Sequence, residues 1–215
     1  MDNSSEKVRL NERKWDRRSS TYDQKRFDYF RWMQQRAIRL IDLHPGMHFL
    51  DIGCGTGWAV RYVAGLLQGD GEFSGVDISG GMIEKAKNQT QGLEQVHFYQ
   101  ANAEKLPFED GRVDDALCTN SFHHYPDPLK ALVEIGRVLK PGGRFYILDV
   151  TSDDFFIRWI DSRVRQNEQE HVKFYSSREY QAMFAAAHLD HVQSRIITYP
   201  LKVHIAGKAG TGMDL

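Results

Sequence analysis

Three glycines and two aspartates have the spacing of a small-molecule binding site. Asp51 follows a short apolar run, and Gly53, Gly55 and Gly57 come after it in a GxGxG turn. Glycines let the backbone approach a ligand closely, and the first turn of a following helix offers N–H groups to an anion. Asp77 lies 20 residues beyond Gly57, where a carboxylate at a strand end can accept hydrogen bonds from ribose hydroxyls. The spacing predicts an adenosine-containing ligand, and it differs from the GxGxxG of dinucleotide-binding turns.

A second group of side chains could act on a substrate. Asn120, His123, His124 and Tyr125 follow the expected fourth strand on the ligand side of the sheet. Histidine titrates close to neutral pH, so His123 or His124 is a candidate general base. The alternative is that the two histidines support the mouth of the site structurally, and the sequence leaves both roles open.

The elements that must position these residues alternate between strands and helices. Apolar runs bounded by turn-forming residues predict strands at 47–52, 72–76, 95–100, 116–119 and 144–150. Apolar residues at three- and four-residue steps predict helices at 22–43, 59–66, 82–90, 128–139 and 177–188. Two final strands, 191–198 and 201–206, are expected to form an antiparallel pair. This alternation implies right-handed crossovers, so the predicted fold is an α/β doubly wound domain with a mainly parallel sheet.

The predicted organisation is an N-terminal helical cover, residues 1–45, followed by one main domain, residues 46–215. Within the main domain, residues 151–175 interrupt the alternation with an aromatic cluster and then a polar stretch. We interpret this segment as an inserted helical lid, and the alternative is a helix packed on the sheet as part of the core.

Composition limits the class of protein. The 215 residues are 41% apolar and 27% charged, which suits one soluble domain with a small appendage. The two cysteines, Cys54 and Cys118, fit a reducing compartment and cannot make a four-ligand zinc site alone. No apolar run approaches the roughly 18 residues of a membrane span, and the start lacks the apolar core of a signal peptide. We therefore expect a cytoplasmic protein without a membrane span.

Charge is unevenly distributed along the chain. Residues 1–40 contain 11 Lys and Arg against 6 Asp and Glu, so this arm is basic although the whole chain has a formal charge of −1. The arm could attract an anionic substrate or a nucleic acid, or it could be the solvated face of a helix. Interspersed aspartates favour the solvated helix, so a nucleic-acid partner is not expected.

Five motifs occur together and in order. They are FLDIGCGTG, GVDIS, QANAEKLPF, CTNSFHHYPDP and RVLKPGGRF. Together they resemble class I S-adenosylmethionine-dependent methyltransferases, particularly the small-molecule branch that includes ubiquinone and menaquinone biosynthesis enzymes, over residues 15–206. The resemblance implies S-adenosylmethionine as the cofactor and a seven-stranded sheet of order 3-2-1-4-5-7-6 with strand 7 antiparallel.

The resemblance also implies which residues bind the cofactor. They are Asp51, Gly53, Gly55 and Gly57 at the methionine end, Asp77 at the ribose, Ile78 and Met82 near the adenine, Asn102 and Ala103 at the adenine edge, and Asn120 beside the methionine moiety. Asn102 stands where the family commonly has Asp, but its amide oxygen can accept the same hydrogen bond. Three of these assignments have structural alternatives. Asp51 could brace the glycine turn, Asp77 could cap the following helix, and Asn102 could be a turn residue.

The same resemblance bears on the reaction. Direct in-line transfer of an activated methyl group requires an aligned acceptor and exclusion of water, and it needs no metal in principle. Tyr22 with Asp23 resembles a Tyr-Asp pair of related enzymes, so Tyr22 joins His123 and His124 as a candidate for the catalytic site; packing of its ring in the core is the alternative.

The acceptor is inferred from what the sequence lacks. The two cysteines argue against an arsenite-type acceptor, and the NPPY-type signature of enzymes that methylate bases or glutamine is absent. We expect a small organic acceptor, and either a monomer or a homodimer. An RNA or protein methyltransferase and a non-catalytic cofactor-binding module are the alternatives, whereas GxGxG spacing disfavours an NAD-dependent oxidoreductase.

Overall fold

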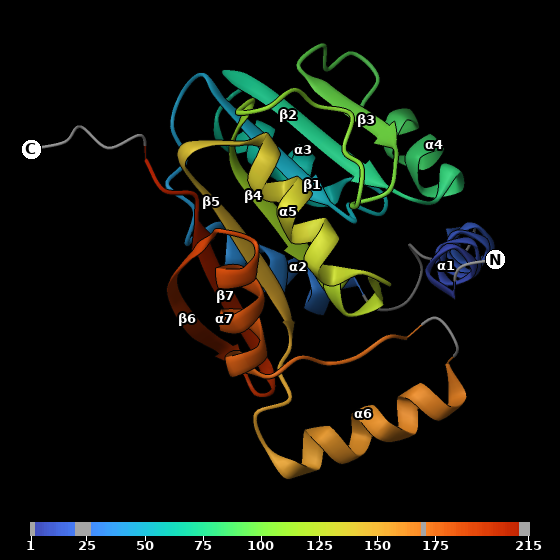
Figure 1. Cartoon of the computed structure of the whole chain (residues 1–215). Coiled ribbons are helices and arrows are strands. Elements are labelled where there is room, and N and C mark those ends of the chain that lie inside the picture. The colour runs from blue at the N-terminus through green and yellow to red at the C-terminus, as the bar shows by residue number, and fades with distance from the viewer. Residues whose placement is uncertain (1–2, 20–26, 169–170, 211–215) are drawn as a thin grey trace, which may run out of the picture.

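A seven-stranded sheet forms the centre of the molecule (Figure 1). The computed structural model describes residues 3–19, 27–168 and 171–210. The strands are β1 Met47–Ile52, β2 Gly71–Asp77, β3 Val96–Gln100, β4 Val113–Thr119, β5 Leu139–Val150, β6 Asp190–Thr198 and β7 Leu201–Gly207. Their order is β3-β2-β1-β4-β5-β7-β6; β1 to β5 pair in parallel, and β7 is antiparallel to both β5 and β6. The predicted fold class and strand order are confirmed.

Helices cover both faces of this sheet. They are α1 Asn3–Ser19, α2 Phe27–Ile38, α3 Trp58–Leu66, α4 Gly80–Asn88, α5 Pro128–Val138, α6 Phe155–Asn167 and α7 Ser177–Ala186, with a short 3-10 helix η1 Phe122–His124. Apolar residues of α2, α3 and α4 pack in one core cluster, and those of α5 and α7 pack in a second cluster. Phe49 and Leu50 of β1 belong to opposite clusters because successive strand residues point to opposite faces. Burial of both faces leaves the strand ends as the accessible edges of the sheet.

Several elements differ slightly from the bounds predicted from sequence, and β5 and α2 differ most. β5 begins at Leu139 because this residue pairs with Val113, so the strand continues through the expected stop at Pro141. α2 ends at Ile38 instead of residue 43, because the N–H groups of Leu40 and Ile41 bond to carbonyls only three residues back. Both differences come from backbone pairing that local composition does not encode.

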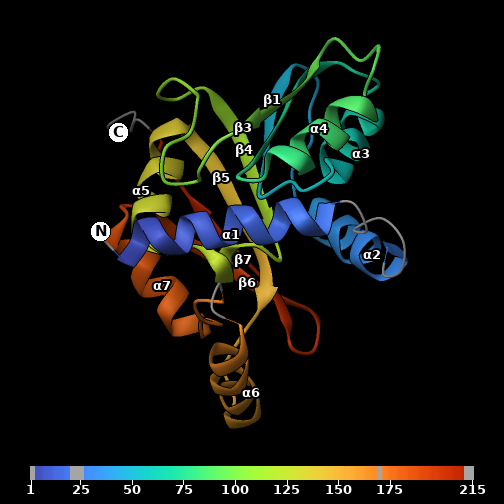
Figure 2. The same ribbon diagram turned by 90° about the vertical axis from the view of Figure 1, so that its right-hand side faces the viewer.

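Two helices lie outside the covering layers. Figure 2 looks at the edge where the parallel strands end, and α1 lies across this edge. α6 projects away from the sheet (Figure 1), and Phe155, Phe156 and Trp159 are exposed by 77%, 58% and 49%. α6 is therefore not a core helix. Among the described residues, no helix combines the length and the apolar content needed to cross a membrane.

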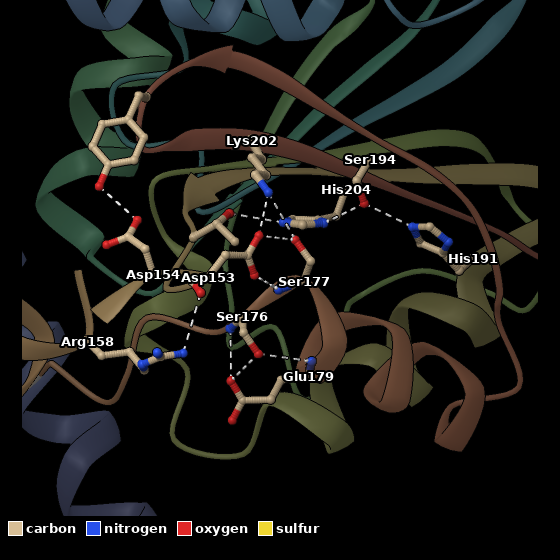
Figure 3. Close-up of polar contacts among 12 residues, drawn as sticks. Asp153, Asp154, Arg158, Ser176, Ser177, Glu179, His191, Ser194, Lys202 and His204 are labelled. Atoms are coloured by element: carbon tan, nitrogen blue, oxygen red, sulfur yellow. Dashed lines mark hydrogen bonds and ion pairs between the residues drawn. The ribbon is translucent and has the colours of Figure 1, made fainter. Parts of the chain in front are cut away.

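Polar contacts attach the base of α6 to α7 and β7 (Figure 3). Asp153, just before α6, accepts a hydrogen bond of 2.7 Å from the Ser177 backbone N–H and forms an ion pair with Lys202 of β7. Ser176 and Glu179 form a capping box at the start of α7. These contacts fix the point at which α6 leaves the sheet.

Candidate functional site

A pocket opens between the ends of β1 and β4, where the strand order reverses. Open α/β sheets bind ligands at this position. The pocket encloses about 730 Å³, including its open mouth. Of the residues predicted from sequence, its wall contains Gly53, Gly55, Asp77, Ile78, Met82, Asn102, Ala103, Asn120, His124 and Tyr125. The fold thus brings residues from several separate motifs around one space.

The glycine turn after β1 contributes to the wall. Gly53 has a φ of +75°, and a Cβ there would lie 2.2 Å from Ser121 Oγ. Gly57 has a φ of +74° but does not line the pocket, and a Cβ there would lie 2.4 Å from the Phe98 ring. Gly53 therefore allows close approach at the pocket, whereas Gly57 allows the start of α3 to pack against β3.

Asp51 is a buried carboxyl group next to the pocket wall. Its side chain is fully buried, and neither of its oxygens has a hydrogen-bond partner among the described residues. Burial, together with the nearby negative charge of Asp77, raises the pKa of Asp51 to about 8. The next two residues, Ile52 and Gly53, line the pocket. A buried carboxyl group without a partner is costly, so this position fits a ligand that brings a positive charge. Because no described residue bonds to its oxygens, no contact in this part of the chain shows Asp51 bracing the glycine turn.

Asp77 ties the end of β2 to the glycine turn. Its two carboxylate oxygens accept hydrogen bonds from the backbone N–H groups of Gly55, at 2.8 Å, and Ser79, at 2.9 Å. Burial raises the pKa of Asp77 above its ordinary value, although these two bonds act in the opposite direction. The cap of α4 is Ser79, whose hydroxyl accepts from Met82 N–H at 3.2 Å. Asp77 therefore holds a carboxylate at the pocket wall instead of capping this helix.

The other residues predicted to bind the cofactor include apolar side chains and two asparagines with different backbone roles. Met82 and Ala103 are buried and, with Ile78, give the wall an apolar part. Asn102 Oδ1 accepts a hydrogen bond of 3.0 Å from the Glu104 N–H, so Asn102 is a turn residue that also lines the pocket. Asn120 has a φ of +50° and donates its backbone N–H to a carbonyl of β5.

Helix α1 closes one side of the pocket; it lies within the residues 1–45 expected to form a helical cover, but the sequence did not indicate which of its residues would face the pocket. Val8, Asn11 and Trp15 line the pocket, and their spacing of three and four residues places them on one helix face. Asn11 Nδ2 donates a buried hydrogen bond of 2.8 Å to the His124 carbonyl, and Asp16 Oδ1 accepts one of 2.5 Å from Ser79 Oγ. The basic arm is thus attached to both sides of the pocket. Tyr22 lies outside the described residues.

The two adjacent histidines occupy different positions. His124 is buried, lines the pocket and contacts the Trp15 ring edge-on at 5.6 Å between ring centroids. His123 does not line the pocket, and its Nδ1 lies 2.8 and 2.9 Å from the oxygens of the fully buried Asp149. The structure thus brings His124, but not His123, to the pocket wall.

The fold and the site together define the class of protein. The sheet order, the glycine turn after β1 and the acidic residue at the end of β2 are those of class I S-adenosylmethionine-dependent methyltransferases. The unpartnered carboxyl group of Asp51 fits the positive amino group of this cofactor, and the Asp77 carboxylate fits a ribose.

Comparison with known proteins shows the family. Residues 43–196 match the family described as "Methyltransferase domain", and the chain belongs to this family. YcgJ of Bacillus subtilis strain 168, named an uncharacterized methyltransferase, is 38% identical over 156 residues, which are 71% of this chain and 60% of YcgJ. Demethylmenaquinone methyltransferase of Staphylococcus aureus strain MRSA252 is 34% identical over 126 residues, 58% of this chain and 52% of that protein. The chain spans about half the length of the curated relatives it matches.

Solved structures have the same fold. The YcgJ crystal structure superposes with a TM-score of 0.70 at 25% identity, over 85% of this chain and all of YcgJ (100%). A chain from the complex that contains the Haloferax volcanii Trm112 methyltransferase activator gives a TM-score of 0.79 at 21% identity, over 91% of this chain and 97% of that chain. The second comparison supports the fold alone.

Proposed function

We propose that this chain transfers a methyl group from S-adenosylmethionine to a small organic acceptor by direct in-line displacement. The observation that carries the proposal is the unpartnered, buried Asp51 carboxyl group at the turn that lines the pocket, with the Asp77 carboxylate in the wall of that pocket. The Asp51 carboxylate would attract an ammonium group, and the Asp77 carboxylate would accept hydrogen bonds from hydroxyl groups. A nucleoside that carries an amino acid has both kinds of group.

The proposal gives each pocket residue a role. Asp51, Gly53 and Gly55 hold the amino-acid end, with Asn120 beside it, and Asp77 holds the ribose. Ile78, Met82, Asn102 and Ala103 form the adenine end of the same wall. Gly57 contributes indirectly, because it allows the packing that holds the turn in place.

The chain's own residues would provide positioning and exclusion of water. S-adenosylmethionine, when bound, supplies a methyl group already activated on sulfur. Trp15 and Val8 of α1 cover the pocket, and fixing reactants in near-attack geometry can contribute roughly 7–11 kcal/mol. His124 lies in the wall with Asn120, and we assign this histidine to the acceptor end; His123 does not line the pocket and contacts Asp149 instead.

The choice of a small organic acceptor has separate support. Several relatives are named demethylmenaquinone methyltransferase, and one is named an O-methyltransferase. Both cysteines are buried, which does not suit a thiol-based capture of metalloid acceptors. These observations favour an organic acceptor with a hydroxyl or an activated carbon.

Ligand-induced thermal stabilisation tests the cofactor part. S-adenosylmethionine and S-adenosylhomocysteine should raise the melting temperature, and NAD and ATP should not. A ligand at about 100 times its Kd adds roughly 2.7 kcal/mol to the free energy of unfolding. Asp77→Asn should reduce this protection, and the exposed Asp70→Asn should serve as a matched control that retains it. Protection by NAD instead would contradict the proposal.

Product formation tests the reaction. Release of S-adenosylhomocysteine should be seen with some members of a panel of phenols and quinols, with a mass gain of one methyl group on the acceptor. Methylation of RNA or protein alone would overturn the choice of acceptor. Cofactor binding without turnover on any acceptor would support a non-catalytic module.

A further inference from the structure

Three histidines from two distant segments meet beside the pocket. His123 and His124 follow β4, and His171 lies between α6 and α7. One ring nitrogen of each histidine lies within 4.8 Å of one ring nitrogen of each of the other two. Among the described residues, this is the group of side chains close enough together to hold a metal ion. His124 also lines the pocket, so the group adjoins the proposed acceptor end.

Two buried carboxylates orient the outer histidines of this group. Asp149 lies 2.8 and 2.9 Å from His123 Nδ1, and Asp161 lies 2.7 Å from His171 Nε2. Asp161 is itself fixed, because its Oδ1 accepts a hydrogen bond of 2.8 Å from Phe174 N–H. In a neutral imidazole, a carboxylate that accepts from one ring nitrogen holds the proton there, and the other nitrogen can then bind a metal. Asp149 with His123 and Asp161 with His171 are thus carboxylate–histidine pairs of the kind found around metal sites.

The distances are close to those of a metal site. Three atoms no more than 4.8 Å apart lie within about 2.8 Å of a common point, compared with about 2.0–2.1 Å for a zinc–nitrogen bond. Each ring would have to move by less than about 1 Å. The two segments are already joined, because the His123 carbonyl accepts a hydrogen bond of 3.0 Å from Val172 N–H.

The charge of the surroundings also suits a cation. The side chains of Asp149 and Asp161 are 0% and 3% exposed, and their negative charges would offset those of a divalent ion. Arg165 also forms an ion pair of 3.0 Å with Asp161, so a cation would enter a desolvated site that holds two carboxylates and one guanidinium group.

We propose that His123, His124 and His171 bind a divalent transition metal, with Zn²⁺ the best fit to three imidazoles, and that its open position faces the pocket. The ion would bind a hydroxyl oxygen of the acceptor, whose proton leaves to solvent because the cation stabilises the anion. That oxygen then forms the bond to the methyl carbon as the carbon–sulfur bond breaks. This role rests on the function proposed above, whereas metal binding does not.

The site was not visible in the sequence because its members are far apart. His171 lies 47 residues beyond His124, and such a separation matches no metal-binding motif. Only the path of the chain from α6 to α7, which returns His171 to the loop after β4, brings the three rings together.

Titration of the full chain, freed of metal by a chelator and dialysed, tests the proposal. Zn²⁺ should bind with a stoichiometry of one, and Co²⁺ should give the intense visible bands of a four-coordinate site. His171→Gln and His123→Gln should weaken Zn²⁺ binding at least 100-fold, and Asp161→Asn about 10- to 100-fold. His97→Gln, on the exposed side of β3, should bind as the wild type does.

Binding of S-adenosylhomocysteine, measured on the same samples by calorimetry, separates the two proposals. All four variants should retain it. Wild-type protein that binds neither Zn²⁺ nor Co²⁺, or His variants that bind them unchanged, would overturn the metal site. Metal binding without S-adenosylhomocysteine binding would instead overturn the function proposed above. If a variant does not fold, the wild-type stoichiometry and the Co²⁺ spectrum decide the question.

Discussion

Under the proposed function, the buried Asp51 carboxyl group should make cofactor binding depend on pH. Its pKa of about 8 means that about one molecule in ten carries the ionised form at pH 7, and ionising Asp51 there costs about 1.4 kcal/mol. Binding of an ammonium group requires the carboxylate, so binding should release close to one proton at pH 7. The affinity for S-adenosylhomocysteine should rise with pH up to about 8, and the Kd should fall about 50-fold between pH 6 and pH 8.

Substitution of Asp51 by Asn should remove this dependence. Asp51→Asn keeps the shape of the largely neutral side chain, so the melting temperature of the ligand-free protein at pH 7 should change little. The Kd at pH 8 should rise about 10- to 100-fold, since a hydrogen bond between charged groups contributes about 1.5–3 kcal/mol.

Calorimetry in two buffers of different ionisation enthalpy measures both the Kd and the released proton. Asp70→Asn, an exposed change of the same chemistry, should show the wild-type pH profile. A wild-type Kd that is flat from pH 6 to pH 8, together with unchanged binding by Asp51→Asn, would refute the assignment of Asp51 to the cofactor's ammonium group.

Two further predictions concern stability. Gly57→Ala should lower the melting temperature by about 3–10 °C in thermal denaturation, because its Cβ would lie 2.4 Å from the Phe98 ring at a φ of +74°; an unchanged melting temperature would show that the turn relaxes freely. Burial lowers the pKa of His204 from 6.5 to about 4, so the unfolded chain binds a proton in this window that the folded chain excludes. The free energy of unfolding, measured by urea titration, should therefore be highest above pH 6.5 and fall by up to about 3 kcal/mol as the pH drops to 4. His204→Gln should reduce this dependence on pH. An equally steep dependence in the variant would assign the effect to other groups.

The strands and their ends were predictable because their signals are local. β1 spans Met47–Ile52 as expected, since an apolar run is bounded by Pro45-Gly46 before it and the glycine turn after it. Asp51 and Asp77 were expected at one edge because parallel strands end at the same edge, and the structure places them close enough to raise the pKa of Asp51. The roles of these residues and the domain bounds, including a lid at 151–175, stay predictions.

The helix over the pocket was not predictable in the same way. A helical cover was expected in residues 1–45 and a lid in residues 151–175, and among the described residues the pocket wall includes three from α1 and none from α6. The deciding contacts of α1 join residues far apart in the chain, such as Asn11 and the His124 carbonyl. An amphipathic pattern shows that a helix has an apolar face but not which surface that face covers.

The sequence by itself determined the alternation of strands and helices, the glycine turn and the positions of the strand-end carboxylates, because propensity and turn chemistry act over a few residues. Only the tertiary structure decided that Asp51 is buried with no hydrogen-bond partner among the described residues, that α1 covers the pocket and that His171 joins His123 and His124. Those properties depend on packing between segments tens of residues apart, and burial, desolvation and ligand geometry exist only once such segments are in contact.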